Sequence, residues 1–454
     1  MHISIPITQD LVDNLGGRYV LYSVYLEGFL LFKVRYKDLH FWNEQMYDIF
    51  GKRLPKFPPK YYLAMTESMA EERRVTLEQY LQGVVSDSVI SGSDVFITGL
   101  KKFQLETFKL PCIKVVLKVY LPDGRQVNVD SKTSDSAERV LEAALYTLNV
   151  SRELVEYFGL FITHKDSEGA YSVVKKIAPF EIPFITIWHI NDDSYQIDIR
   201  KWYTTPTTDA MLMGCGGAID LLYAQAVQEL EMNWSRPTEQ QTEMLKELIK
   251  AENKVKFLET MQQVEHYSYQ KLNPGVTDYP NCNTVATVSM GNNEMYCSLQ
   301  TSDNRTEIIS VHVSKMTRCH VPLHQPEKTM DQQECKLCLI DGQVPKFISI
   351  LTKQQPENTM DQQECKLCFI DGQVPKLISI RTKQAFLLSK WIKKMLSEQP
   401  LPCVKENLEI QDNITSSNIL SRNPKKIDVA CGIKDPIYTS LRECDSSDLY
   451  DDNQ

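Results

Sequence analysis

The sequence predicts a multidomain α+β chain, because its hydrophobic pattern changes character several times along 454 residues. Apolar and polar residues alternate in 17–36 and 113–121, as in half-buried strands, whereas 209–272 has the period of helices. A chain of this length has room for roughly three or four domains. We expect four folded segments and a disordered acidic tail, with the boundaries 1–110, 111–205, 206–274, 275–399 and 400–454.

Composition narrows the class of protein. Hydrophobic residues make up 42% and charged residues 24% of the chain, which is typical of soluble globular proteins. No uncharged apolar run approaches the ~18 residues that span a bilayer, and the N-terminal sequence lacks the pattern of a secretory signal. We therefore expect any membrane contact to be peripheral and cytosolic. In that compartment the 12 cysteines predict reduced thiols, not a disulfide framework.

The stretch 33–81 combines positive charge with an apolar string. Between Lys33 and Arg74, nine Lys and Arg accompany six Asp and Glu, although the whole chain has a net charge of -9. A basic site in an acidic chain favours a compact anionic ligand over general attraction to polyanions such as nucleic acid.

A phosphorylated inositol headgroup would suit this stretch. Arginine can bind one phosphate through two nitrogens, lysine can reach another, and an aromatic face can cover the ring. The residues with these properties are Arg35, Tyr36, Lys60 and Arg73. The adjoining side chains suited to enter a membrane interface are Tyr61, Tyr62, Leu63 and Met65. Alternatively, the arginines are solvated charges and the Pro-Pro-Lys segment is a rigid turn.

The order of these motifs resembles the PX domain of sorting nexins. Arg35-Tyr36 is followed by Pro58-Pro59-Lys60 and then by Glu-Glu-Arg-x-x-x-Leu-Glu-x-Tyr, which contains Arg73. The resemblance implies binding of phosphatidylinositol 3-phosphate, with Arg35 on the 3-phosphate and Tyr36 stacked on the inositol ring. It also implies that Lys60 reaches the 1-phosphate and Arg73 bonds the ring hydroxyls. Family members often have a second arginine where this chain has Val34.

Local signals predict the elements of the first domain. We expect a hairpin turn at Glu27-Gly28, a helix from Asp38 to Phe50 and a helix from Asp94 to Phe108. Ser68 and Glu71 fit a capping box at the start of the helix that carries the second arginine of the site. The inner face of the first helix is predicted to contain Leu39, Trp42, Met46 and Ile49.

The next two domains differ in their periodicity. A ubiquitin-like β-grasp is predicted from one helix, which Asp135 and Glu138 can cap, and from strands near 113–121, 126–130, 158–163, 171–175 and 195–199. A helical bundle follows, with helices at 219–234, 238–250 and 251–269. The glycines in 214–217 could imitate a phosphate-binding loop, but they lack its Lys-Ser/Thr, so we interpret them as a linker.

The fourth domain is predicted to contain strands followed by a single helix. The strands are expected at 284–290, 294–300 and 308–316, and the helix at 384–398. One apolar stripe on this helix, spaced i, i+3, i+4 and i+7, consists of Leu388, Trp391, Ile392 and Met395. Core packing alone would also explain the stripe.

This series of domains resembles a FERM-like module, and a PX domain before such a module is typical of one subgroup of sorting nexins. The segments LLYAQAVQELEMNW and HYSYQKL are similar to that subgroup.

The last domain of the subgroup resembles a phosphotyrosine-binding (PTB) or PH-like sandwich with a C-terminal helix. The resemblance implies recognition of Asn-Pro-x-Tyr/Phe motifs in the cytoplasmic tails of transmembrane receptors, which can add to an open sheet edge. The implied contacts are Val311, Val313, Met316 and His320 with the helical stripe of Leu388, Trp391, Ile392 and Met395. A close relative has a tryptophan near Cys319 or His320, which this chain lacks.

A 30-residue segment occurs twice in succession, at 325–354 and 355–384, with four differing positions. We expect the second copy to supply the strands before the terminal helix, while the first loops out or competes for the same edge. The copies contain Cys335-x-x-Cys338 and Cys365-x-x-Cys368, a spacing that ordinarily indicates zinc. Because one duplication creates both pairs, and because the pattern also suits a buried strand, we favour structural cysteines.

These observations predict a non-enzymatic cargo adaptor on the cytosolic face of early endosomes, without a cofactor beyond its membrane lipid. Two alternatives remain: a cytosolic scaffold with little lipid binding, and a zinc- or thiol-dependent enzyme, for which we find no nucleophile–base pair. Short acidic tails in the subgroup can engage endosomal retrieval machinery. The sequence here finishes Asp-Leu-Tyr-Asp-Asp-Asn-Gln, without the expected final apolar residue.

Overall fold

The computed structural model describes residues 1–61, 66–279, 281, 283–300, 305–316, 363–371 and 374–399. For residues 363–371 and 374–379 it describes the backbone alone. All the described residues belong to one compact unit, Met1–Pro400. The tail 400–454 and the first copy of the duplicated segment lie outside the described residues. No helix in the described ranges is long and apolar enough to cross a bilayer.

The N-terminal part contains a three-stranded antiparallel sheet in the order β1-β2-β3. Its strands are β1 (Ile3–Val12), β2 (Arg18–Leu26) and β3 (Phe29–Arg35). The predicted hairpin turn is confirmed, because Glu27 and Gly28 have φ of 53° and 85° between β2 and β3, as a two-residue turn requires. Strand β1 is missing from the prediction, since its outer half is exposed and shows no buried alternation.

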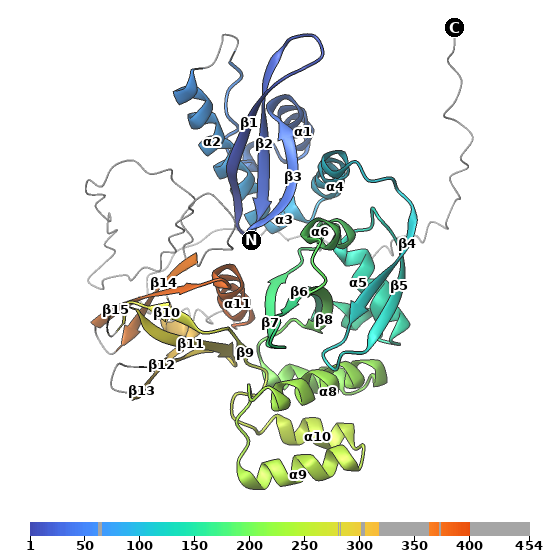
Figure 1. Cartoon of the computed structure of the whole chain (residues 1–454), viewed down its shortest axis with the longest axis vertical. Coiled ribbons are helices and arrows are strands. Elements are labelled where there is room, and N and C mark those ends of the chain that lie inside the picture. Colours follow the sequence, from blue (N-terminus) through green and yellow to red (C-terminus); the bar gives the residue numbers. More distant parts are fainter. Residues whose placement is uncertain are drawn as a thin grey trace, which may run out of the picture. The chain divides into compact units, whose positions relative to one another are not determined.

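Four helices accompany this sheet (Figure 1), namely α1 (Tyr36–Phe50), α2 (Glu67–Ser86), α3 (Ser88–Ser91) and α4 (Asp94–Phe108), with a 3-10 turn η1 (Gly51–Arg53). Two expectations are wrong. Ile49 is 63% exposed, because it lies at the edge of the inner face near the end of α1. The cap of α2 is Thr66, whose Oγ1 accepts a hydrogen bond from the Met69 N–H at 3.3 Å, so Ser68 already lies inside the helix.

The second sheet has five strands in the order β5-β4-β8-β6-β7, and β4 runs parallel to β8. Two hairpins around a parallel central pair, crossed by a helix, form the predicted β-grasp. Its elements are β4 (Lys114–Tyr120), β5 (Gln126–Lys132), α5 (Ala137–Thr147), η2 (Arg152–Tyr157), β6 (Phe158–Lys165), β7 (Tyr171–Lys176), α6 (Pro183–Ile190) and β8 (Tyr195–Lys201). The side chain that caps α5 is Ser136, not Asp135 or Glu138.

The helical part follows directly. It comprises η3 (Pro206–Thr208), α7 (Asp209–Leu212), α8 (Gly216–Glu231), α9 (Glu239–Lys250) and α10 (Lys254–Met261). The third predicted helix is shorter than expected, since His266 and Ser268 have positive φ. Gly217 lies inside α8, not in a linker, and a Cβ there would come within 2.1 Å of the Leu148 carbonyl oxygen. Close packing therefore explains this glycine.

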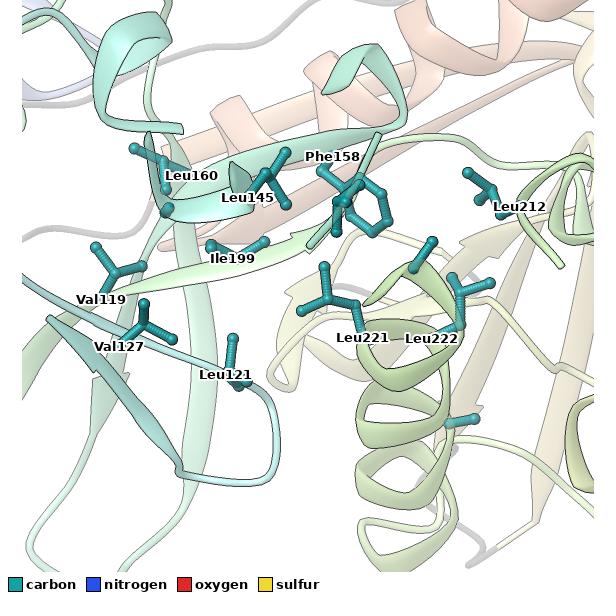
Figure 2. Packing of buried hydrophobic residues seen from close by; sticks show 14 of the residues in the cluster. Val119, Leu121, Val127, Leu145, Phe158, Leu160, Ile199, Leu212, Leu221 and Leu222 are labelled. Carbon is teal, nitrogen blue, oxygen red and sulfur yellow. The ribbon is translucent and has the colours of Figure 1, made fainter. Parts of the chain in front are cut away.

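One hydrophobic core joins the second sheet to the helical part (Figure 2). Side chains of the sheet such as Val119, Phe158 and Ile199 lie in the same buried cluster as Leu221 and Leu222 of α8. Because the β-grasp and the helices share this core, they support each other as one FERM-like body.

The last lobe is a seven-stranded sheet with one long helix. Its strand order is β13-β12-β11-β10-β15-β14, and β9 pairs with β11. The elements are β9 (Gln270–Lys271), β10 (Gly275–Thr277), β11 (Thr284–Gly291), β12 (Glu294–Gln300), β13 (Thr306–His312), η4 (Val313–Lys315), β14 (Gln363–Asp371), β15 (Val374–Thr382) and α11 (Ala385–Glu398). As expected, the second copy of the duplicated segment forms β14 and β15.

Buried contacts connect the lobes. Ala178 and Phe180 of the β-grasp belong to the core of the N-terminal domain, and Phe161 belongs to the core of the last lobe. Lys390 of α11 donates a hydrogen bond from Nζ to Oε2 of Glu27 at 2.8 Å. The described residues thus form a multidomain α+β structure with shared interfaces.

Candidate functional site

The basic site lies where β3 passes into α1. Arg35 ends β3 and precedes the first helical residue, Tyr36. Arg73 lies in the second turn of α2, so one arginine of the site comes from the end of a strand and the other from a helix. Lys60 is exposed in the segment before α2.

Aromatic rings hold the guanidinium group of Arg73. Its Cζ lies 4.2 Å from the centre of the Tyr36 ring and 4.5 Å from that of Tyr61. Nη2 donates to the Pro59 carbonyl at 3.5 Å, and the Tyr36 hydroxyl donates to the Pro58 carbonyl at 2.9 Å. The two prolines therefore do more than form a rigid turn, since their carbonyl groups orient both functional side chains.

Arg35 is held differently. Its Cζ lies 3.4 Å from the centre of the Tyr19 ring, and its Nη2 lies 3.8 Å from Oδ2 of Asp13, with 27% of the arginine side chain exposed. Its Nε is buried and has no hydrogen-bond partner within the described ranges. A positioned guanidinium with uncommitted N–H groups can bind a phosphate with little loss of side-chain entropy.

Arg73 is more deeply buried than Arg35. Only 7% of Arg73 is exposed, and its Nε also lacks a hydrogen-bond partner among the described residues. Burial raises the pKa of the neighbouring Tyr22, whereas the charge of Arg73 acts to lower it. Two fixed positive charges at one end of the sheet can together bind a compact anion.

The predicted membrane-insertion residues are only partly covered by the structure. Tyr61 is half-buried beside Arg73, while Tyr62, Leu63 and Met65 lie outside the described residues. A further apolar side chain, Leu15 in the β1–β2 turn, is 97% exposed. Leu15 was not predicted as part of the site, because β1 was not recognised in the sequence.

The residues predicted to bind cargo gather in the core of the last lobe. The described members of this set are at most 6% exposed: Val311, Val313, Met316, Leu388, Trp391, Ile392 and Met395. His320 lies outside the described residues. In this structure they stabilise the packing of α11 on the sheet, and their contact with a peptide stays a prediction. Ile308 on β13 is 55% exposed and was not singled out.

The described residues contain no group of three or more His, Cys, Asp and Glu side chains that could hold a metal ion. Cys335 and Cys338 lie outside the described ranges. Cys365 and Cys368 lie on β14, for which the structure describes the backbone alone. Zinc binding by these four cysteines therefore stays an alternative prediction.

Two residues of the basic site were missed, Asp13 and Tyr19. A signal for Tyr19 does exist. Arg35 is opposite Leu21 in the β2–β3 register. Tyr19 lies two residues before Leu21, so its side chain is on the same face of the sheet as Arg35 and is its diagonal neighbour across the two strands. The turn that carries Asp13 could not be placed without β1.

Comparison with known families agrees with this architecture. Residues 30–103 match the PX domain, residues 115–204 match the F1 lobe of the FERM domain of sorting nexins 17, 27 and 31, and residues 268–355 match the Sorting Nexin 17 FERM C-terminal domain. The fold and these matches define a protein with a PX domain and a FERM-like module. The last match covers the first copy of the duplicated segment, whereas β14 and β15 come from the second.

The chain belongs to the sorting nexin family. It is 52% identical over 417 residues to sorting nexin-31 of Xenopus laevis, which covers 90% of each chain. It is 42% identical to sorting nexin-31 of Homo sapiens over 419 residues, 90% of this chain and 88% of that protein. Sorting nexin-17 of Rattus norvegicus is 36% identical over 321 residues, 70% of this chain and 68% of that protein. The predicted subgroup of sorting nexins is thereby confirmed.

Proposed function

We propose that this sorting nexin is a peripheral adaptor of early endosomes, which binds phosphatidylinositol 3-phosphate through its PX domain and cargo tails through its last lobe. The observation that carries the lipid part is the convergence of Arg35, Tyr36 and Arg73 at one end of the first sheet, with both guanidinium groups on aromatic rings. Membership of an adaptor family supports a binding role over catalysis.

In this proposal each side chain has a distinct task. Arg35 binds the 3-phosphate through the edge of its guanidinium group, Tyr36 packs on the inositol ring, and Arg73 bonds the ring hydroxyls. Lys60, which is exposed, supplies a flexible charge for the 1-phosphate next to the bilayer. Charge-assisted hydrogen bonds of this kind contribute ~1.5 to 3 kcal/mol each.

Co-sedimentation with vesicles tests the lipid part. The full chain is mixed with phosphatidylcholine vesicles with or without phosphatidylinositol 3-phosphate, and compared with Arg35→Ala. We expect lipid-dependent binding that falls about ten- to a hundredfold in the variant. Arg125→Ala is the matched control, because Arg125 carries the same charge but pairs with Asp123 in a turn of the β-grasp.

Equal sedimentation of the wild type with both kinds of vesicle would contradict the lipid part. The protein would then be better described as a cytosolic scaffold that uses its FERM-like module for protein contacts. The variants must first be shown to unfold at the wild-type temperature, so that a loss of binding reflects the site.

The cargo part rests on the sheet of the last lobe. Strand β13 stands at one end of the strand order and pairs with β12 alone among the described strands. An extended segment with an Asn-Pro-x-Tyr/Phe motif can add to such an edge through backbone hydrogen bonds. The exposed Ile308 on this strand offers an apolar contact for the added segment.

A further inference from the structure

The β1–β2 turn places a carboxylate inside the basic site. Oδ1 of Asp13 accepts hydrogen bonds from the backbone N–H groups of Leu15 and Gly17 at 3.0 and 2.7 Å. The Asp13 N–H donates to the Gly17 carbonyl at 2.9 Å. These bonds fix the side chain and leave Oδ2 facing Nη2 of Arg35 at 3.8 Å.

A second turn in the same chain shows what the fold itself requires of such an aspartate. Asp166, between β6 and β7, accepts at Oδ1 from Glu168 and Ala170 N–H groups at 3.0 and 2.7 Å, and its own N–H donates to the Ala170 carbonyl at 3.0 Å. Both turns use only one carboxylate oxygen. Asparagine retains that acceptor, so the negative charge of Asp13 is additional to the needs of the turn.

The position of this charge limits how an anion can approach Arg35. The Tyr19 ring covers one face of the guanidinium at 3.4 Å, which leaves its edge for hydrogen bonds. The nitrogen nearest to Asp13 lies on that edge, and the Asp13 side chain is 38% exposed. Any phosphate that binds there must displace the carboxylate or lie beside it.

We propose that Asp13 is a specificity-determining residue that restricts the site to inositol headgroups with a single phosphomonoester. The inference rests on the proposed function and deepens it. A fixed negative charge partly compensates Arg35 and repels a second phosphomonoester on the same ring, while one phosphate can still use the remaining N–H groups. Rejecting a wrong ligand by like-charge repulsion is a general route to specificity.

The test measures the ratio of affinities for different headgroups. The full chain is titrated with phosphatidylcholine vesicles that contain the 3-phosphate, the 3,4-bisphosphate or the 3,5-bisphosphate of phosphatidylinositol. Competition with soluble inositol 1,3-bisphosphate separates recognition of the headgroup from contact with the bilayer. The variants are Asp13→Asn and, as the control matched in turn and charge, Asp166→Asn.

We expect the wild type and Asp166→Asn to prefer the monophosphate lipid equally. Asp13→Asn should bind the bisphosphate lipids about two- to fivefold more tightly, as an interaction between exposed charges allows. Its affinity for the monophosphate lipid should rise by a smaller factor. Asp13→Ser, which is also neutral and can accept the turn hydrogen bonds, must reproduce the change. This second variant guards against an effect of asparagine on the turn.

Three outcomes would overturn the inference in distinguishable ways. If the wild type binds the monophosphate lipid and Asp13→Asn keeps its ratio of affinities, Asp13 serves the turn only and the proposed function stands. An equal rise for all three lipids means that Asp13 weakens anion binding without selecting. If the wild type binds none of the lipids above plain phosphatidylcholine, the proposed function and the inference both fail.

Discussion

Lys390 of α11 and Glu27 of the β2–β3 turn form an ion pair of 2.8 Å, in which the two side chains are only 13% and 3% exposed. Removing one partner of a buried pair leaves an uncompensated charge and costs about 3 to 5 kcal/mol. We expect Glu27→Gln to lower the free energy of unfolding by that order, measured by urea denaturation. The exposed pair of Asp123 and Arg125 provides the control, because Asp123→Asn should cost less than about 1 kcal/mol.

The same ion pair predicts how the stability of the folded protein changes at low pH. Burial alone would raise the pKa of Glu27, but Lys390 and Lys175 overcome it, so the pKa is lowered from 4.5. A lowered carboxyl pKa contributes stability above 4.5 that is lost as the pH falls through the folded value. The melting temperature of the wild type should therefore fall more steeply below that pH than the melting temperature of Glu27→Gln. Parallel curves would show that Glu27 is not paired.

Lys176 predicts how the stability of the folded protein depends on pH above neutrality. Burial, reinforced by the charge of Lys390, lowers its pKa to about 7, so the charged form is unfavourable in the folded state. Lys176→Met should be more stable than the wild type at pH 6. Because the folded wild type loses this proton near pH 7 and the unfolded chain only near 10.5, the advantage should shrink as the pH rises between these values. A pH-independent difference would contradict the lowered pKa.

The contact of α4 with α1 predicts a steric effect. A Cβ at Gly99 would come within 2.1 Å of Nε1 of Trp42, which donates to the Val95 carbonyl at 3.2 Å. Gly99→Ala should destabilise the protein by about 1 to 3 kcal/mol, because the tryptophan must move. No atom lies within 4 Å of a Cβ built at Gly216, so Gly216→Ala should be neutral or slightly stabilising. Thermal unfolding of both variants and the wild type measures the difference.

Cargo binding predicts an effect at the edge strand of the last lobe. Ile308→Asp should weaken a labelled Asn-Pro-x-Tyr peptide by about fivefold or more in a polarisation assay, because an apolar contact is lost and a charge is desolvated. Val116→Asp is the control, since Val116 is 59% exposed on a strand of the β-grasp. Unchanged binding of the peptide to Ile308→Asp would place the cargo site elsewhere.

Local signals were enough for many elements of the fold. The helix from Asp94 to Phe108 and the turn at Glu27-Gly28 are found where the sequence predicts them, because caps and positive φ are encoded within a few residues. The helix α6 was missed, since it is short and apolar and resembles a buried strand in pattern. The cap of α2 was misplaced by two residues, because Thr66 and Ser68 both belong to the residue types that cap helices.

The candidate sites show where sequence reasoning stops. The apolar stripe of α11 was recognised, but its spacing is the same for a groove wall and for a core face, and only tertiary packing shows that Trp391 is buried. Arg35, Tyr36 and Arg73 were found by motif. Their partners Tyr19 and Asp13 come from a neighbouring strand and turn, whose proximity depends on sheet register.

The adaptor proposal is tested most directly with vesicles that carry phosphatidylinositol 3-phosphate and a tethered Asn-Pro-x-Tyr peptide, alone and together. Two weak contacts of one protein with one surface raise the effective concentration of the second contact. We predict that the full chain binds vesicles with both ligands at least about tenfold more tightly than vesicles with either one, and that Arg35→Ala and Ile308→Asp each abolish this gain. Equal affinity for vesicles with one ligand and with both would contradict the proposed adaptor.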